Sequence, residues 1–418
     1  IYLTATGRND WDSRLAFSDY KSFFYPSVGL SAILTSMFNA PDWLTYLKVR
    51  GSYTEVGNSY GRFMTTVTYP YDEQTQNWTS TSSYPNTKLK PERTKSWEVG
   101  LDARILNDIS LNLTYYRSNT YNQTFYADLS LSSGYSNIPI QSGNIMNEGI
   151  EMALGYNKQW KDFSFNTNYT LTWNKNRVKR LADGVYNYAT GQSIQMPELS
   201  PLTYGHTDAR LILRVGGSMG DVYGQRLLKR DLNGYILNEE GVGLTMENKE
   251  TYLGSILPKM NMGWSLGFGY KGVNLGMTFT GRFGGIVISE TQSVLDAAGV
   301  SKVSADVRDA GGVQINQGKV SAQTYYQAIQ GTAAYYTYSA TNVRLGELSL
   351  SYTLPKKWFD NKVGMTVGLV GKNLWMIYCK APFDPELTTS AASNFYQGFD
   401  AYMLPSTRNF GFNIKFQF

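Results

Sequence analysis

The chain has 418 residues, a formal net charge of +5, one cysteine and an aromatic content of 14%. Its mean hydropathy is -0.33, and no apolar run is long enough for a membrane helix, so a helical membrane protein is excluded. The basic residues are scattered and the net charge is small for this length, which gives nucleic-acid binding no support. The lone Cys379 cannot form an internal disulfide, so it says little about the compartment.

From the N-terminus onward, apolar and polar residues alternate in segment after segment, which predicts strands with one apolar and one polar face. Residues 1–6 are already strand-like, and without an initiator methionine or a signal peptide we expect them to belong to a longer exported precursor. The cleanest segments are 97–105, 163–173 and 262–270, each close to the ~9–11 residues that a tilted strand needs to cross a membrane. Weaker segments are 27–34, 47–53, 110–116, 150–156, 273–283, 343–354 and 363–369.

The last segment, residues 407–418, reads TRNFGFNIKFQF and alternates without a fault. Phe410, Phe412, Ile414, Phe416 and Phe418 share one face. An apolar face this aromatic, repeated along a chain, is what a transmembrane β-barrel presents to lipid while its polar face lines the lumen. We therefore predict an all-β fold, a transmembrane antiparallel β-barrel. We also predict that Phe410, Phe412, Phe416 and Phe418 act as the signal for assembly into the outer membrane.

Short and long connections alternate along the chain, as in bacterial barrels, where the short turns are periplasmic and the long loops external. The short ones are 106–109, 158–162, 271–272 and 355–361, and the long ones are about 56–94, 120–145, 176–259, 284–341 and 378–406. Counting from a first rising strand to a last strand that ends in the periplasm gives about twelve strands. In segment 343–354 the apolar parity switches after Gly346, which predicts a bulge.

The long loops are rich in Tyr, Ser, Asn and Gly, as in residues 186–196 and 333–340. This composition suits an adaptable binding surface for sugar rings or peptide side chains, although external loops of any barrel are polar and variable. The inward-facing charges also have two interpretations, binding of a solute or a solvated network in the lumen. These charges are Lys48, Arg50, Glu98, Asp102, Arg104, Glu151 and Arg282.

Two short stretches match catalytic or nucleotide-binding motifs. Residues 216–220, GGSMG, match the G-x-S-x-G nucleophile elbow, but no helical pattern follows, and the only histidine is His206. Residues 267–272, GFGYKG, match the dinucleotide fingerprint, but they lie in an alternating strand and a two-residue turn, with no helix to hold a pyrophosphate. We therefore expect no enzyme, and no catalytic residue, cofactor or metal site.

Several stretches, spread in order along residues 25–418, carry a resemblance to a known family. They are LKPERTKSWEVG (89–100), YG (223–224), RDLNGY (230–235), RFGG (282–285), VRLGELSLSYTLP (343–355), GKNLW (371–375), PFDPE (382–386) and LPSTR (404–408). Together they resemble the SusC/RagA family of TonB-dependent outer-membrane transporters.

The resemblance implies import of a nutrient, an oligosaccharide or an oligopeptide, across the outer membrane of a Bacteroidetes-type Gram-negative bacterium. It implies a barrel of about 22 strands with a plug inside, a SusD-like lipoprotein outside, energy from TonB, and a dimer of transporter–lipoprotein pairs. The plug and the TonB-contacting box belong to the N-terminal half of such proteins, and the sequence contains neither. We therefore expect residues 1–418 to form the C-terminal part of the barrel.

Three alternatives remain at this point. A passive outer-membrane porin would need no plug, lipoprotein or energy. A barrel enzyme is disfavoured by the single histidine and the lack of an acid–base pair. A soluble, aromatic-rich carbohydrate-binding sandwich is disfavoured by aromatic residues that line whole strand faces.

Overall fold

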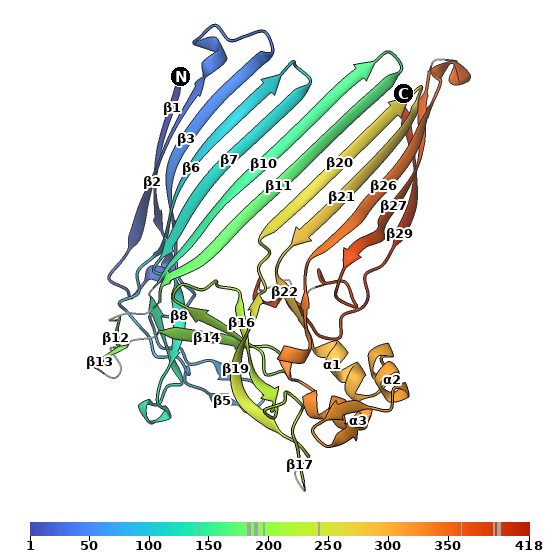
Figure 1. The fold of residues 1–418 in the computed structure, drawn as a ribbon. Helices are drawn as coiled ribbons and strands as arrows, with labels where there is room; N and C mark the ends of the chain where they lie inside the picture. Colours follow the sequence, from blue (N-terminus) through green and yellow to red (C-terminus); the bar gives the residue numbers. More distant parts are fainter. Residues whose placement is uncertain are drawn as a thin grey trace. The chain divides into compact units, whose positions relative to one another are not determined.

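The computed structural model describes residues 1–141, 143–181, 185–187, 191–194, 197–240, 243–360, 362–387, 389–390 and 394–418. Its main element is a twelve-stranded sheet (Figure 1). In sheet order the strands are β1 (Tyr2–Trp11), β2 (Ser22–Ile33), β3 (Leu44–Asn58), β6 (Glu92–Ile105), β7 (Ile109–Tyr121), β10 (Asn144–Trp160), β11 (Phe163–Arg180), β20 (Met260–Tyr270), β21 (Val273–Phe283), β26 (Asn342–Leu354), β27 (Gly364–Cys379) and β29 (Asn409–Gln417). Wherever the register is defined, neighbouring strands in this sheet are antiparallel.

The predicted strands are confirmed in number and order, because each expected segment matches one strand of this sheet, apart from one or two residues at some ends. Several strands are longer than expected: β10 has 17 residues and β11 has 18. The extra residues continue the pairing toward the long connections, where the requirement for one lipid-facing side no longer imposes a clean alternation.

Two local predictions are also confirmed. Thr278 pairs with Glu347 and Phe279 with Leu345, so Gly346 is the extra residue of a bulge. Residues 267–272 form part of a hairpin, in which Lys271 and Gly272 have φ angles of 46° and 90°. Two positive φ angles are typical of the type I′ turn, whose twist matches that of the flanking strands.

The long connections contain elements that the sequence did not predict. Their strands are β4 (Tyr71–Asp72), β5 (Asn77–Trp78), β8 (Thr124–Asp128), β9 (Asn137–Gln141), β12 (Val185–Asn187), β13 (Gln192–Ile194), β14 (Glu198–Thr203), β15 (Arg210–Arg214), β16 (Asp221–Leu228), β17 (Asn238–Glu239), β18 (Gly243–Leu244), β19 (Met246–Ser255), β22 (Ile286–Ser289), β23 (Val313–Ile315), β24 (Gly318–Val320), β25 (Thr337–Ser339) and β28 (Phe399–Asp400). Short 3-10 helices lie at Ser13–Leu15, Leu34–Ser36, Leu131–Ser133, Ala333–Tyr335, Lys356–Phe359 and Asn394–Tyr396.

Three α-helices lie in the connection between β21 and β26: α1 (Glu290–Ala297), α2 (Lys302–Asp309) and α3 (Ala322–Ile329). Each begins after a serine, Ser289, Ser301 or Ser321, whose side chain accepts a hydrogen bond from a backbone N–H of the first turn. Such caps satisfy donors that the helix itself leaves unpaired. Among the described residues, no helix has the length and apolar character needed to cross a membrane.

The chain divides into two compact units, and the first comprises Ile1–Gly155, Thr172–Pro201 and Leu213–Met219. Its buried apolar clusters lie in the long connections and at the strand ends beside them, not in the middle of the sheet. One cluster contains Leu15, Phe23, Tyr60 and Leu89, a second contains Ala127, Ile138 and Ile140, and a third contains Ile145, Val178, Leu181 and Leu213.

The second unit comprises Tyr156–Leu171, Leu202–Ile212 and Gly220–Phe418. Its largest cluster contains Tyr204, Ala209, Leu211, Val222, Ile256, Ile288, Ala333 and Phe399. A second cluster joins α3 to the neighbouring connections through Leu228, Ile236, Ile315, Ala322, Tyr326, Ile329 and Tyr336. Within each unit, the long connections lie at the opposite strand ends from the short turns (Figure 1).

Candidate functional site: the polar face of the sheet and the long connections

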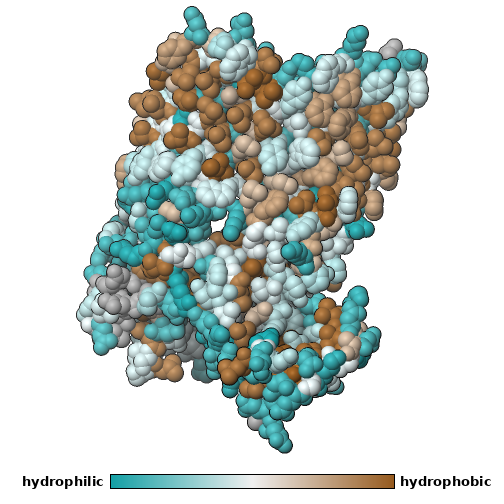
Figure 2. Space-filling model, viewed as in Figure 1, coloured by the Kyte–Doolittle hydropathy of each residue, from teal (hydrophilic) through white to brown (hydrophobic). Residues whose placement is uncertain are grey.

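One face of the sheet exposes large apolar side chains. Leu30 on β2 is 53% exposed, Val99 on β6 is 56% exposed and Leu369 on β27 is 64% exposed. In Figure 2, brown hydrophobic residues gather over the long strands and teal hydrophilic residues gather over the long connections. An exposed apolar surface of this extent is a liability in water but suits contact with lipid.

Aromatic pairs lie on the same face. In the second unit, the rings of Trp264 and Phe279 are 5.8 Å apart, near the middle of the β20–β21 hairpin. In the first unit, the rings of Trp97 and Tyr115 are 5.3 Å apart. Trp97 lies at the end of segment 97–105 that faces the long connections, where barrels place a girdle of aromatic residues at the membrane interface.

The opposite, polar face of the first unit carries an ion network on β3, β6 and β7. Arg50 Nη1 lies 3.2 Å from Glu98 Oε1, and Arg50 Nε lies 3.9 Å from Asp102 Oδ2. Lys48 Nζ is also 3.9 Å from Asp102 Oδ2, and Arg50 donates a hydrogen bond to Thr114. All of these side chains are partly exposed, so each ion pair contributes ~0–1 kcal/mol to the free energy of unfolding. For these four charges the expected solvated network is confirmed.

Where β11 and β20 lie side by side, the polar face of the second unit is lined by neutral groups, while Glu347 and Lys372 form an ion pair on the same face at β26 and β27. Gly263 and Gly267 on β20 lie beside Thr170 and Asn166 on β11. A Cβ atom at Gly267 would lie 2.6 Å from the Asn166 amide, and one at Gly263 would lie 2.8 Å from Thr170 Oγ1. The glycines therefore leave room for amide and hydroxyl groups, which both donate and accept hydrogen bonds. This wall suits a neutral polar ligand.

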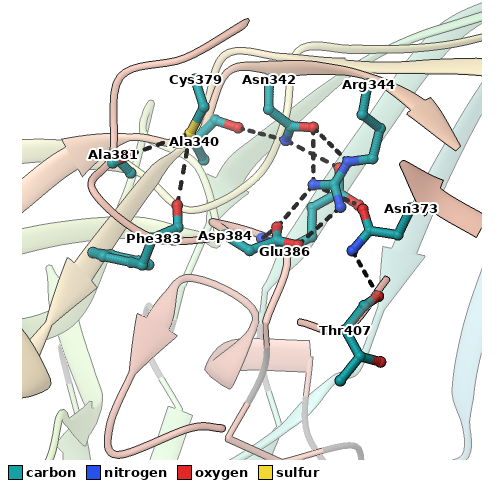
Figure 3. A network of polar contacts seen from close by, with 10 residues as sticks. All are labelled: Ala340, Asn342, Arg344, Asn373, Cys379, Ala381, Phe383, Asp384, Glu386 and Thr407. Carbon is teal, nitrogen blue, oxygen red and sulfur yellow. Dashed lines mark hydrogen bonds and ion pairs between the residues drawn. The ribbon is translucent and has the colours of Figure 1, made fainter. Parts of the chain in front are cut away.

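A buried polar network joins β26 to the segment that follows β27 (Figure 3). Arg344 donates to both carboxylate oxygens of Asp384, over 2.9 Å and 2.8 Å. Arg344 also donates to Asn342 Oδ1, and Asn342 Nδ2 donates to Glu386 Oε1 over 3.0 Å. The side chains of Arg344 and Asp384 are only 11% and 8% exposed. This bidentate geometry is the strongest that a guanidinium offers a carboxylate.

The charge of Asp384 is set by opposing effects. Burial disfavours its ionised form, but the hydrogen bonds from Arg344 and from the Glu386 backbone N–H outweigh burial, so the pKa of Asp384 lies below its usual value. The network therefore holds a charged pair at neutral pH, and it fixes residues 382–386 against β26.

Several tyrosines of the second unit's connections are packed inside them, while others, such as Tyr252, are exposed. Tyr336 is 2% exposed and Tyr204 is fully buried, with its hydroxyl donating to the Phe395 carbonyl over 2.7 Å. Burial raises the pKa of Tyr325 and of Tyr338 to about 12 in each case, so both stay neutral. Residues 333–340, which the sequence offered as a candidate binding surface, thus help to form a core. Within segment 186–196, residues 188–190 and 195–196 lie outside the described residues.

Three of the predicted assembly residues lie on one face of β29, and the fourth, Phe418, directly follows the strand. Phe410, Phe412, Phe416 and Phe418 are 80%, 79%, 54% and 98% exposed. Phe412 pairs with Leu369 and Phe416 with Met365 on β27. Their face is that of the apolar side of the sheet, as expected. Their role as an assembly signal stays a prediction.

Comparison with known proteins assigns the chain to a protein family. The family model described as "TonB dependent receptor-like, beta-barrel" matches residues 2–374. The chain belongs to this family. TonB-dependent receptors are β-barrel proteins of the Gram-negative outer membrane, and the family is one of transporters, not of enzymes.

Relatives of this TonB-dependent receptor confirm the resemblance to SusC and RagA. The chain is 25% identical to TonB-dependent receptor P3 of Formosa agariphila over 454 residues, covering 99% of this chain and 44% of the relative. It is 28% identical to TonB-dependent receptor SusC of Bacteroides thetaiotaomicron over 154 residues, covering 36% of this chain and 14% of SusC. The structure of the RagAB peptide transporter matches with a TM-score of 0.74 and 20% identity, covering 99% of this chain and 45% of that chain. The receptor chain thus spans less than half of the length of P3 and of the RagAB chain.

In this receptor the two motif matches have structural explanations. Ser218 lies in a turn between β15 and β16, where a nucleophile elbow requires a following helix. Gly272 lies in the hairpin turn, next to the start of a strand and not of a helix. Neither stretch has the context of its motif.

The Arg344–Asp384 pair is the part of the site that sequence reasoning missed. Both residues lie in stretches that carry the family resemblance, VRLGELSLSYTLP and PFDPE. They are forty residues apart, and the segment that follows β27 turns back and brings Asp384 to Arg344 on β26. A signal was present in the sequence, since each of these two stretches contains a residue of opposite charge.

Proposed function

We propose that the receptor chain is the C-terminal part of a TonB-dependent importer that takes up an oligosaccharide or an oligopeptide. The observation that carries this proposal is the twelve-stranded sheet with an apolar outer face and a hydrogen-bonding inner face. β1 and β29 are the edges of this sheet, and a barrel in lipid must have no open edge. Further strands, to a total of about 22, and a plug would come from the rest of a longer protein.

The neutral part of the inner face at β11 and β20 supports the proposed class of substrate. Sugar hydroxyls and peptide amides both donate and accept hydrogen bonds, as do the groups near Gly263 and Gly267. The RagAB structure is described as that of a peptide transporter, which supports an oligopeptide. The relative named SusC supports the same importer class without naming a substrate.

The proposed partner outside the membrane is a SusD-like lipoprotein that covers the long connections. We name the segment from α1 to α3, residues 290–329, the helical insert. In this insert, Leu295, Val300 and Val303 are 40%, 69% and 51% exposed. Exposed apolar side chains on an otherwise folded element fit burial against a protein partner. The proposal places the long connections outside the cell and the C-terminus in the periplasm, and it includes a dimer of transporter–lipoprotein pairs and a TonB contact through the plug.

The test is uptake by cells that express the full-length receptor and its lipoprotein. Cells receive labelled oligopeptide and oligosaccharide mixtures, with TonB intact or deleted. The proposal requires that cells with TonB accumulate one of the two substrate classes. Without TonB, accumulation should fall to the level seen in cells that lack the receptor. Uptake that continues unchanged without TonB would identify a passive porin.

A further inference from the structure

Basic side chains gather on the lipid-facing side of the first unit, near the long connections. We name Arg93, Lys95, Arg117, Lys175 and Arg177 the basic rim. On β6, Lys95, Trp97 and Val99 are exposed while Ser96 and Glu98 between them are less so. Because successive strand residues point to opposite faces, Lys95 and Arg93 share the face of Trp97 and Val99. By the same alternation Arg117 shares the face of Tyr115, and Lys175 and Arg177 share that of Trp173.

The pairing of the strands sets the level of this rim. Trp97 pairs with Arg117 and Lys95 with Asn119. The segment from Trp97 to Ile105 matches the ~9–11 residues that cross the hydrocarbon layer. Arginine at the membrane midplane of a barrel costs ~2–4 kcal/mol, but little near the interface. The basic rim therefore lies where hydrocarbon gives way to lipid headgroups.

The rim has more positive charge than its carboxylates neutralise. Arg93 and Lys95 share one carboxylate, that of Glu55, over 3.2 Å and 3.3 Å. Lys175 Nζ lies 3.9 Å from Glu148 Oε1, a distance that leaves the pair loose.

Two members of the rim have no carboxylate partner. Within the described part of the chain, neither Arg117 nor Arg177 has an ion pair. With two carboxylates and five cations, the basic rim has a net positive charge and can bind an anion.

The basic rim is a local feature and not a property of every strand end. In the second unit, the corresponding ends of β20 and β21 present Met260, Met262, Gly281 and Phe283 on the apolar face. An even ring of basic residues would serve only to anchor the barrel in any membrane. A cluster on one group of strands indicates recognition.

We propose that the basic rim binds the phosphate groups of a phosphorylated glycolipid in the outer leaflet. Guanidinium groups suit phosphate oxygens because they offer two parallel donors, as Arg117 and Arg177 can. Lysine stems such as those of Lys95 and Lys175 run along apolar surface and carry the ammonium to the headgroup. The neighbouring Trp97–Tyr115 pair provides an apolar wall for the acyl chains. The assignment to the outer leaflet rests on the proposed function, which puts the long connections outside.

The experiment measures lipid retained by the full-length receptor. The receptor is purified in nanodiscs made of phosphatidylethanolamine with either a bisphosphorylated glycolipid or its dephosphorylated form, and bound lipid is counted by native mass spectrometry. The test variant is Arg117→Gln with Arg177→Gln. These substitutions keep every cation of the rim that is paired with a carboxylate. The matched control is Lys161→Gln with Lys271→Gln, which removes two charges from the short-turn end.

The wild type and the control should retain the phosphorylated glycolipid, and the test variant should retain about tenfold less, equivalent to ~1.4 kcal/mol. All three should retain the dephosphorylated form equally and weakly. The proposal is overturned if the test variant matches the wild type, if phosphate groups make no difference, or if inorganic phosphate alone binds while the glycolipid does not. Substrate uptake by the test variant is measured in parallel, so that a failed lipid site remains distinguishable from a failed importer.

Discussion

At the scale of single residues, the buried pair of Arg344 and Asp384 makes the sharpest energetic prediction. Asp384→Ala leaves a guanidinium that is 11% exposed without its carboxylate. Removing one partner of a buried pair costs ~3–5 kcal/mol. Hydrogen exchange of residues 382–386 should therefore become much faster. The control is Asp306→Ala, which breaks the exposed Lys302–Asp306 pair and should cost no more than ~1 kcal/mol. Similar effects of the two substitutions would contradict the importance given to the Arg344 network.

The same carboxylate predicts a pH dependence. The pKa of Asp384 is lowered in the folded protein. A lowered pKa stabilises the fold above the pKa of the unfolded chain, ~3.9, and that contribution is lost as the pH falls through the folded value. The thermal midpoint in detergent should therefore fall more steeply below pH ~4 in the wild type than in Asp384→Asn. Parallel curves for the two proteins would contradict the assignment.

The two faces of β6 predict opposite tolerance to charge. Leu101 pairs with Val49 and Leu113 on the apolar face, near the middle of the strand. Leu101→Arg should cost ~2–4 kcal/mol on folding into lipid. Asp102→Asn, on the polar face, gives up only loose ion contacts at 3.9 Å and should cost no more than ~1 kcal/mol. Folding titrations in lipid vesicles measure both, and equal costs would contradict the assignment of the faces.

At the scale of single elements, the bulge at Gly346 predicts the effect of a deletion. Removing Gly346 would restore regular pairing with β21. It would also turn Arg344 to the opposite face, because the deletion of one residue reverses the face of every strand residue before it. Deletion should therefore abolish the Arg344–Asp384 pair and destabilise the strand. Gly346→Ala is the control, because a Cβ atom there meets its nearest neighbour, the Thr278 carbonyl oxygen, at an ordinary 3.6 Å. Thermal unfolding in detergent compares the two. A deletion as mild as the alanine substitution would show that the bulge has no role in register.

The strands were predictable from sequence because lipid and lumen impose opposite demands on alternate residues. The segment 97–105 shows this most clearly, and the bulge at Gly346 was visible as a change of parity. Strand ends such as those of β10 and β11 were not predictable, since beyond the hydrocarbon layer both faces meet water or protein. The helices α1–α3 were missed because each is only eight residues long and depends on contacts with distant segments for its stability.

The candidate site was predictable only where its partners lie on adjacent strands. Lys48, Arg50, Glu98 and Asp102 were recognised as inward charges, and β3 and β6 pair directly. The pairing of Arg344 with Asp384 depends on a turn back after β27, which alternation does not encode. The basic rim was also overlooked, although the shared parity of Lys95 and Trp97 was present in the sequence.

At the scale of the whole molecule, the proposed lipoprotein contact can be tested on the helical insert. Leu295→Gln with Val303→Gln removes exposed apolar groups without touching a buried cluster. Co-purification of the lipoprotein with the full-length receptor should fall several-fold, because apolar groups at the centre of an interface dominate its affinity. The exposed Asp306→Ala variant should co-purify as the wild type does. Unchanged co-purification after the apolar substitutions would move the contact away from this insert.

The central claim is that the sheet crosses a membrane with one face in lipid and the other in water, and spin labels along β6 test it most directly. Labels are placed one at a time at Trp97, Glu98, Val99, Leu101 and Asp102 of the full-length receptor in lipid vesicles. Collisions with oxygen report lipid, and collisions with a water-soluble nickel complex report water. The account predicts high oxygen accessibility at 97, 99 and 101 and high nickel accessibility at 98 and 102, alternating out of phase with period two. Nickel accessibility that is equally high at all five positions would contradict it.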